Sequence, residues 1–319
     1  MFKFLQTFRS RKNPQTCFHP DTPVKPEVAV NIKELKVFRR EYFPDEGRPI
    51  PWLDREDAPE IVASLREKGE INDTEQELCL KWIKDGYIIL ENFFAEELLD
   101  EVWSAYEKAL ADKSIEPIGD NCQVNGLPER NLNAHMVVKQ IKQLFKHQKI
   151  TSIISLLLGA KSLPFQTIIG HNGSQQLEHS DAIHMTTYPL DYLAATWTAF
   201  EDIDPNAGPL VYYPGSHRQP HFLSKEAGIS IDEFQTRSYL PYHEKYEPGL
   251  QKIIQDNQLE AKYFIAKKGD VLIWHSNLIH GGSLRQDLTL SRKALVCHYF
   301  AEGCVCYHDL ASSLSYLHS

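Results

Sequence analysis

Two stretches, Gln176–His184 (QLEHSDAIH) and Trp274–Gly282 (WHSNLIHGG), carry the residues around which this chain is organised. In an extended strand, side chains two positions apart point the same way, so His179 and Asp181 would present an imidazole and a carboxylate on one face. If His280 arrives from another strand, two histidines and one carboxylate surround one side of a metal ion. That arrangement leaves coordination positions open, as in non-haem Fe(II) oxygenase sites.

Other histidines compete for the same role. The chain has 14 histidines, so a His-x-Asp triplet also arises by chance or as a surface polar pair. His275 is the nearest rival of His280, since it lies five positions earlier and also in an apolar strand. His184 is at an odd offset from His179, and we expect it on the opposite face of the same strand.

Three further blocks give the two stretches a context. They are Asn206–Arg218 (NAGPLVYYPGSHR), Gly269–His275 (GDVLIWH) and Ser291–Phe300 (SRKALVCHYF). With the His-x-Asp triplet before them and His280–Gly282 among them, the ordered set resembles the phytanoyl-CoA dioxygenase family of Fe(II)- and 2-oxoglutarate-dependent oxygenases. The resemblance covers roughly residues 74–304, and the ordered set is more specific than any single block.

The resemblance implies the roles of the central residues. His179, Asp181 and His280 correspond to the iron ligands, and the family places the last ligand directly before a glycine, which favours His280. Arg292 corresponds to the anchor of the distal carboxylate of 2-oxoglutarate, because a guanidinium grips a carboxylate with two parallel hydrogen bonds. The turn between His280 and Arg292 looks one residue longer than the family spacing, so Arg285 inside it is the alternative anchor.

Other positions are weaker candidates. Trp197 matches a family tryptophan beside the cosubstrate, although a buried tryptophan is ordinarily core. Gln166 is a candidate hydrogen-bonding partner of cosubstrate or substrate, and Ser283 is weaker still. Related halogenases have a small residue in the place of Asp181, so its presence favours oxygen insertion over halogenation.

Composition indicates a soluble, acidic protein. Of the 319 residues, 42% are hydrophobic and 24% are charged, which is typical of a globular domain with an ample core. The formal charge of -9 argues against nucleic acid as a partner. No apolar run reaches the ~18 residues of a membrane-spanning helix. The six cysteines are scattered and form no paired metal motif, so we expect free thiols and a cytoplasmic location.

The N-terminal half is expected to be helical. Residues 1–71 form a Pro-rich, irregular arm with a short helix at 57–68, and residues 72–319 a single catalytic domain. The spacing of apolar residues predicts helices and one strand in the first half of that domain. The predicted helices span 75–84, 95–111, 137–148 and 150–158, the strand spans 87–90, and 119–133 is a loop.

Beyond residue 160 the pattern changes to short β-prone runs between turns. These runs are 164–170, 182–188, 194–201, 210–213, 263–266, 271–275 and 293–300. Their spacing suits an α+β, mainly β fold: a double-stranded β-helix (jelly roll, cupin-like) flanked by the N-terminal helices. An aromatic insert at about 219–262, with a helix at 246–257, is expected to act as a lid over the substrate.

The expected activity is hydroxylation of an unactivated C–H bond of a small or medium organic substrate. Fe(II), 2-oxoglutarate and O2 take part, and succinate and CO2 are released. One alternative is a zinc- or manganese-dependent hydrolase or lyase, since the same ligands hold other divalent ions. A second is a non-catalytic metal-binding module. The sequence selects neither the substrate nor the oligomeric state.

Overall fold

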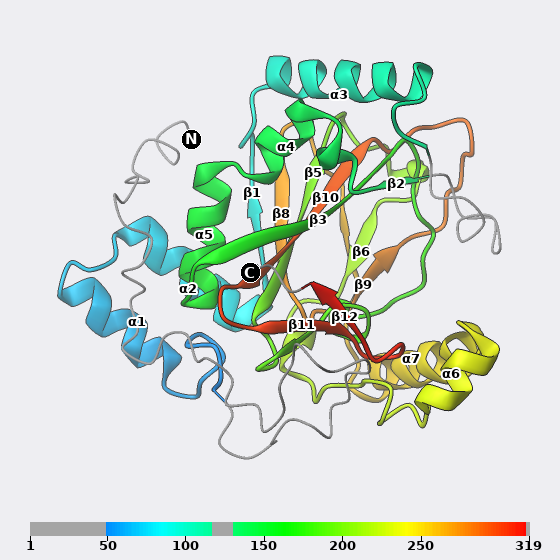
Figure 1. Cartoon of the computed structure of the whole chain (residues 1–319). Coiled ribbons are helices and arrows are strands. Elements are labelled where there is room, and N and C mark those ends of the chain that lie inside the picture. Colours follow the sequence, from blue (N-terminus) through cyan, green and yellow to red (C-terminus); the bar gives the residue numbers. More distant parts are fainter. Residues whose placement is uncertain (1–48, 117–129, 317–319) are drawn as a thin grey trace.

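The computed structural model describes residues 49–116 and 130–316 (Figure 1). Most of the predicted N-terminal arm and of the predicted 119–133 loop, together with Cys17 and Cys122, lie outside these ranges. The other four cysteines are free.

Six of the seven α-helices in the described residues form where the sequence predicts them, and α6 is the exception. The helices are α1 Ala58–Glu67, α2 Asp73–Asp85, α3 Glu96–Ala111, α4 Lys139–Phe145, α5 Gln148–Leu158, α6 Ile231–Arg237 and α7 Glu247–Asp256. Helix α2 begins with a capping box and ends at a glycine. The Asn72 side chain accepts from the Glu75 backbone N–H while the Glu75 carboxylate accepts from the Asn72 N–H. Gly86 ends the helix in the left-handed conformation, at φ 73°.

The strands form three antiparallel sheets. They are β1 Tyr87–Leu90, β2 Arg130–Leu132, β3 Ser162–Gly170, β4 Thr186–Tyr188, β5 Leu193–Ala199, β6 Leu210–Tyr212, β7 Lys262–Phe264, β8 Val271–His275, β9 His280–Gly282, β10 Ala294–Ala301, β11 Val305–His308 and β12 Ser313–Tyr316. The large sheet has the order β1-β8-β5-β10-β3-β2, and the two smaller sheets are β7-β6-β9 and β12-β11-β4. This arrangement confirms the predicted jelly roll with flanking helices.

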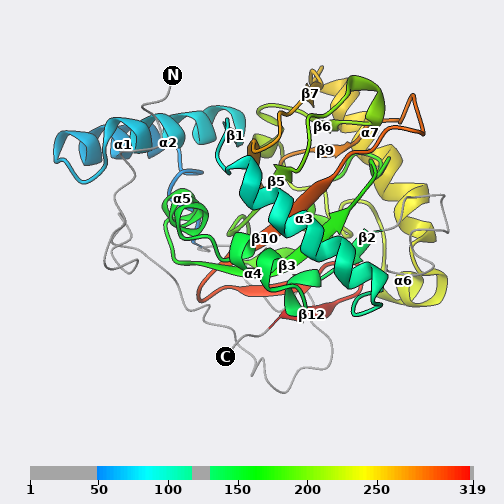
Figure 2. The same cartoon turned by 90° about the horizontal axis from the view of Figure 1, so that it is seen from above.

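The two faces of the large sheet have different neighbours. Leu295, Cys297 and Tyr299 of β10 join one apolar cluster with residues of the N-terminal helices. Helices α3, α4 and α5 lie over this outer face of the large sheet (Figures 1 and 2). Trp52 and Leu53, just before α1, are buried in the same cluster. Alternate residues of the strands point inward and join Trp197 and Trp274 in a second cluster. The inner face of the large sheet is therefore lined by every second side chain of its strands.

Some predicted elements differ from the structure. The run 182–188 is not one strand: a 3-10 turn at Asp181–Ile183 precedes the short strand β4. The predicted loop 119–133 ends in β2, because its last residues pair with Ile168–Gly170 of β3. The strands β9, β11 and β12 were not predicted.

The insert at 219–262 contains the predicted helix, α7, and also α6, which was not predicted. Leu250 and Ile254 of α7 are buried against Val211 of β6 and Ile279. The helix therefore covers the outside of the β7-β6-β9 sheet, on the side of the molecule away from α3 to α5 (Figure 1). A lid role for the insert stays a prediction.

Within the described residues, no helix combines the length and apolarity needed to cross a membrane.

Candidate active site

His179, Asp181 and His280 come together inside the jelly roll. One ligand atom from each lies within 4.8 Å of the others, and all three side chains are buried. His179 and His280 form an isolated antiparallel bridge, in which each backbone N–H donates to the other's carbonyl at 2.9 Å. The segment carrying Asp181 then turns into the 3-10 helix. Two segments a hundred residues apart thus meet through backbone hydrogen bonds, which also join Ala182 to Ser276 and Gly282 to Gln176.

Gly281 and Gly282 make this meeting possible. A Cβ at Gly281 would lie 2.9 Å from the Gln176 carbonyl oxygen, and one at Gly282 would collide with the Ser174 hydroxyl. Only glycine lets residues 174–178 run this close to β9. The two glycines after His280 therefore serve to bring His179 beside it.

Backbone hydrogen bonds set the tautomer of both histidines. Nδ1 of His179 lies 2.9 Å from the Leu177 carbonyl, and Nδ1 of His280 lies 2.9 Å from the Leu278 carbonyl. Since a carbonyl only accepts, each Nδ1 carries the proton and donates it, which leaves the lone pair on Nε2. Burial, followed by the nearby His280, lowers the pKa of His179 to about 3. Its imidazole is therefore neutral and able to bind a metal.

The Asp181 carboxylate has one occupied and one free oxygen. Trp274 Nε1–H donates to Oδ2 at 2.8 Å, whereas Oδ1 lies 3.7 Å from His280 Nε2. Burial alone would raise the pKa of Asp181, but His280, His298 and His179 outweigh it and hold the pKa below its usual range. The result is an ionised, oriented carboxylate next to two free imidazole lone pairs.

His275 points the other way, because it follows inward-facing Trp274 on the same strand. Its Nε2 lies 3.1 Å from Asp54 Oδ2, and its Nδ1 accepts the Asn277 backbone N–H at 3.0 Å. Asp54, Asp191 and His275 also lie within 4.8 Å of one another. Both ring nitrogens of His275 are nevertheless engaged, so this second cluster offers no free imidazole lone pair. The structure brings His280 to the His179/Asp181 pair and keeps His275 away from it.

His184 was expected on the opposite face of a strand from His179, and that expectation is wrong. The 3-10 turn between them changes the direction of the chain. The two rings lie 5.9 Å apart, centroid to centroid.

Arg292 is buried without a counter-charge. Neighbouring Lys293 points to the outer face, over the Trp103 ring, so Arg292 points inward. One of its amino groups donates to the Gly208 carbonyl at 3.0 Å, its Nε has no partner, and its guanidinium carbon lies 5.7 Å from the Trp197 ring centre. Burial, with a smaller effect of Arg285, lowers its pKa to about 10. The side chain still carries its charge at neutral pH, and no described residue forms an ion pair with it.

Arg285 is occupied elsewhere. Its Nη2 donates to the Leu288 and Leu290 carbonyls at 2.7 and 3.0 Å, which closes its own loop. This geometry favours Arg292 over Arg285 as the carboxylate anchor.

Two weaker candidates, Gln166 and Ser283, lie in different places. Gln166 pairs with His298 across β3 and β10 and is half-buried on the inner face. Ser283 lies apart from the other candidates: its hydroxyl donates to the Pro209 carbonyl at 2.8 Å, and it lines an open groove of about 610 Å³ that also borders Tyr263. By strand alternation it faces away from His280, so its placement does not support a role in cofactor binding.

Sequence reasoning missed two neighbours of Asp181. Trp274 donates to its Oδ2, and His298 Nε2 lies 3.7 Å from the same atom. His298 is six positions after Arg292, so an even spacing along β10 would have placed both on one face. Trp274 could have been found because it precedes His275 on one strand, so the two side chains point to opposite faces of the sheet.

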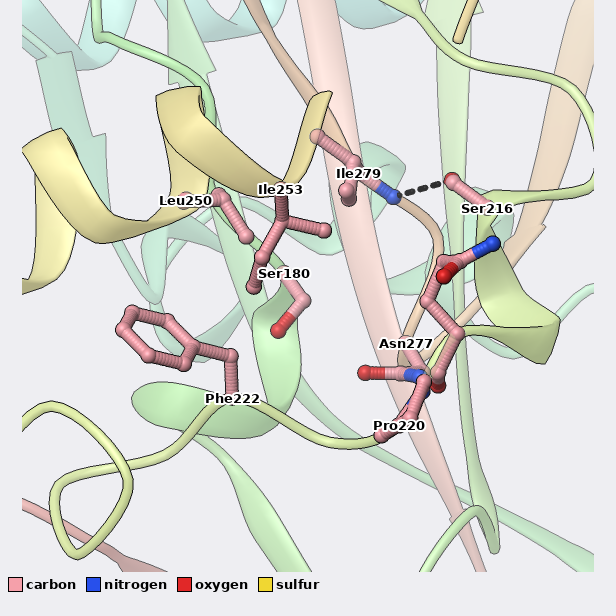
Figure 3. Close-up of a pocket in the computed structure, with 9 residues that line it drawn as sticks. Ser180, Ser216, Pro220, Phe222, Leu250, Ile253, Asn277 and Ile279 are labelled. Atoms are coloured by element: carbon pink, nitrogen blue, oxygen red, sulfur yellow. Dashed lines mark hydrogen bonds between the residues drawn. The ribbon is translucent and has the colours of Figure 1, made fainter. Parts of the chain in front are cut away.

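The insert at 219–262 forms hydrogen bonds with the segment that carries His179 and Asp181. The Ser180 backbone N–H donates to the Tyr246 hydroxyl at 3.2 Å, and Gln251 of α7 donates to the Glu178 carboxylate at 2.7 Å. Figure 3 shows Ser180 facing Leu250 and Ile253 of α7 across a cavity of about 10 Å³, which has room for about one water. This small cavity lies behind the ligand-bearing segment and is too small for a substrate.

Comparison with known proteins gives the family. The model of the phytanoyl-CoA dioxygenase (PhyH) family matches residues 82–285. The peroxisomal phytanoyl-CoA dioxygenase of Rattus norvegicus is 24% identical over 245 residues, which cover 69% of this chain and 67% of the relative. The ectoine dioxygenase of Nocardia farcinica is 24% identical over 249 residues, which cover 74% of this chain and 78% of the relative.

Solved structures agree in fold. EctD from S. alaskensis, crystallised with 2-oxoglutarate and 5-hydroxyectoine, superposes with a TM-score of 0.56 at 18% identity. The match covers 80% of this chain and 82% of EctD. The carbocyclase SnoK from nogalamycin biosynthesis superposes with a TM-score of 0.56 at 16% identity, covering 75% of this chain and 88% of SnoK.

Fold, family and the buried cluster together define an oxygenase of the jelly-roll class that depends on Fe(II) and 2-oxoglutarate. The chain belongs to the phytanoyl-CoA dioxygenase family. The resemblance seen in the sequence motifs is thereby confirmed.

Proposed function

We propose that this protein hydroxylates an unactivated C–H bond of a small or medium organic substrate, with His179, Asp181 and His280 holding Fe(II). The observation that carries the proposal is the convergence of two imidazoles, each with Nδ1 hydrogen-bonded to a backbone carbonyl, on one free carboxylate oxygen. Three ligands on one side of the ion leave positions for a chelating cosubstrate and for dioxygen. Fe(II) with 2-oxoglutarate would supply the activation of O2.

The chain's own residues would orient these groups. Trp274 holds Asp181 in one rotamer through its Nε1–H, and the Leu177 and Leu278 carbonyls hold the two imidazoles. The alternation of β10 puts Arg292 and His298 on the inner face, with half-buried Val296 between them. A 2-oxoglutarate molecule along this face would place its distal carboxylate on the Arg292 guanidinium.

Arg292 also separates this function from the alternatives. A hydrolase or lyase using zinc or manganese at the same ligands has no need of a buried, unpaired guanidinium, and neither has a non-catalytic metal module. An uncompensated buried charge is destabilising unless a ligand pairs with it. The names of relatives span an acyl-CoA ester and the osmolyte ectoine, so they leave the substrate open.

The test replaces the proposed ligands. We expect His179→Ala and Asp181→Ala to lose Fe(II) binding, measured anaerobically by calorimetry, and to lose Fe(II)-dependent conversion of 2-oxoglutarate to succinate. His275→Gln is the matched control, since that rival histidine has both ring nitrogens engaged. It should retain Fe(II) affinity per folded molecule.

Unchanged succinate formation in both ligand variants would refute the site. Loss of Fe(II) binding in His275→Gln, with affinity retained in His179→Ala, would move the site to the Asp54/Asp191/His275 cluster. Turnover that needs Zn(II) or Mn(II) but no 2-oxoglutarate would favour the hydrolase or lyase alternative.

A further inference from the structure

Of the eight buried side-chain polar atoms that lack a partner within the described residues, four carry the argument that follows. Among the described residues, such atoms include Arg292 Nε, His298 Nδ1, Arg130 Nε and Tyr242 Oη. Arg292 has its role in the proposed function, and His298 lies beside Asp181. Arg130 and Tyr242 have no role there. Buried polar atoms are nearly always paired, so two that are left unpaired near one site indicate a missing ligand.

Tyr242 belongs to a cluster of four aromatic rings that lies next to His179 and is called here the His184 ring cluster. Its members are His184, His308, Tyr239 and Tyr242. The His184 ring lies 5.2 Å from Tyr242, 5.5 Å from His308 and 5.9 Å from His179, measured between centroids. The Tyr239 hydroxyl lies 3.1 Å from His308 Nε2. The rings thus extend from the candidate iron ligands to Tyr239, which is 39% exposed.

The ring cluster is partly open to solvent. His184 and His308 are only half-buried, and Tyr239 is 39% exposed. Their flat rings, ring nitrogens and hydroxyl can contact a carbon skeleton and form hydrogen bonds with its polar atoms.

Arg130 points toward the same interior. On β2 the Asn131 amide oxygen accepts from the Tyr106 hydroxyl of α3, which lies on the outer face of the sheet. Strand alternation therefore turns Arg130 inward. Its partner across the ladder is Gly170, which has no side chain to block it. In agreement, burial raises the pKa of Tyr239, and the nearby Arg130 charge opposes that rise.

The charges at the site leave Arg130 uncompensated. If the proposed function holds, Asp181 and the two carboxylates of 2-oxoglutarate match the charges of Fe(II) and Arg292. Arg130 then remains as an additional cation, and it forms no ion pair within residues 49–116 and 130–316. A guanidinium of this kind favours a carboxylate or a phosphate.

We propose that Arg130 and the His184 ring cluster bind the primary substrate, and that this substrate is a small organic anion. Its carboxylate or phosphate pairs with Arg130, its carbon skeleton lies against the rings, and the Tyr242 hydroxyl donates to a polar atom of it. This assignment rests on the proposed function and extends it from the metal to the substrate class.

The test uses matched anionic and neutral probes on protein loaded with Fe(II) and 2-oxoglutarate under anaerobic conditions. Phenylacetate and phenylphosphonate are compared with phenylacetamide by calorimetry and by thermal shift. We expect at least one anion to bind about tenfold more tightly than the amide, as one charge-assisted hydrogen bond provides. The anion that binds more tightly identifies the head group.

Variants assign the effect to Arg130. Arg130→Gln should remove the preference for the anion, and Arg130→Lys should retain part of it. Arg218→Gln, which removes an exposed arginine, should leave it unchanged. Thermal unfolding of each variant reports whether it is folded.

A wild-type protein that binds no anion more tightly than the amide overturns the proposal. So does an Arg130→Gln variant that keeps the preference, or one that loses affinity for 2-oxoglutarate instead, since Arg130 would then serve the cosubstrate. The affinity of the wild type for 2-oxoglutarate is measured in parallel. If that binding is absent, the proposed function fails, while the anion–amide comparison repeated on metal-free protein still tests Arg130 separately.

Discussion

At the scale of single residues, the environment of a side chain decides its role. Arg292 and Arg285 are seven positions apart and chemically identical. Arg285 closes its own loop through two backbone carbonyls, whereas Arg292 is buried and makes one hydrogen bond, to the Gly208 carbonyl. A buried cation without a counter-charge is costly unless a ligand supplies one. The proposed role of carboxylate anchor therefore falls to Arg292 and not to Arg285.

Replacing Arg292 should impair 2-oxoglutarate use selectively. Charge-assisted hydrogen bonds contribute about 1.5–3 kcal/mol, so Arg292→Ala should raise the KM for 2-oxoglutarate by roughly 10- to 150-fold. Steady-state succinate formation at varied 2-oxoglutarate measures this. Arg285→Gln is the matched control and should alter KM much less. A normal KM in Arg292→Ala together with a raised one in Arg285→Gln would make Arg285 the anchor.

At the scale of elements, the insert at 219–262 holds the ligand-bearing segment in place. Tyr246 accepts the buried Ser180 N–H, and Gln251 donates to Glu178. Both contacts flank His179, whose own backbone is paired only with His280. The position of His179 therefore depends on α7 and the turn before it as much as on the sheets.

Removing the Tyr246 hydroxyl should loosen this segment. Tyr246→Phe leaves the buried Ser180 N–H without an acceptor, which should lower the free energy of unfolding by about 1–3 kcal/mol and weaken Fe(II) binding. Denaturant unfolding and anaerobic calorimetry measure the two effects. Tyr263→Phe, at an exposed tyrosine, is the control. If both variants behave alike, the Ser180–Tyr246 hydrogen bond has no such function.

At the scale of the whole molecule, buried neutral histidines make the fold sensitive to acid. Burial lowers the pKa of His217 to about 3 and that of His135 to about 4. The ordinary value near 6.5 applies to the unfolded chain. Between these values the unfolded chain binds more protons than the native one, so stability rises with pH there and falls as the pH drops below about 6.5.

Thermal unfolding should show this dependence directly. The midpoint should be lower at pH 5 than at pH 7.5, and each fully buried histidine contributes at most about 1.4 kcal/mol per pH unit. His217→Gln should flatten the dependence, because the native protein then has one buried histidine fewer. A midpoint that is constant from pH 7.5 to pH 5 would contradict the assignment of these histidines as neutral.

Local signals in the sequence determined much of this protein. The Asn72 cap, Gly86 and the helical periodicity determined α2, and the order of motifs singled out His179, Asp181, His280 and Arg292. Capping and periodicity act within a window of contiguous residues, which is why they can be read from the chain alone.

The tertiary structure alone decided which of these residues meet and what surrounds them. The turn after Asp181, the pairing of β2 with β3, and the positions of Trp274, His298 and Arg130 depend on cross-strand register. Register joins residues far apart in the chain, and strands of three residues have no period to reveal it. The neighbours of the proposed iron site were therefore visible only in the folded molecule.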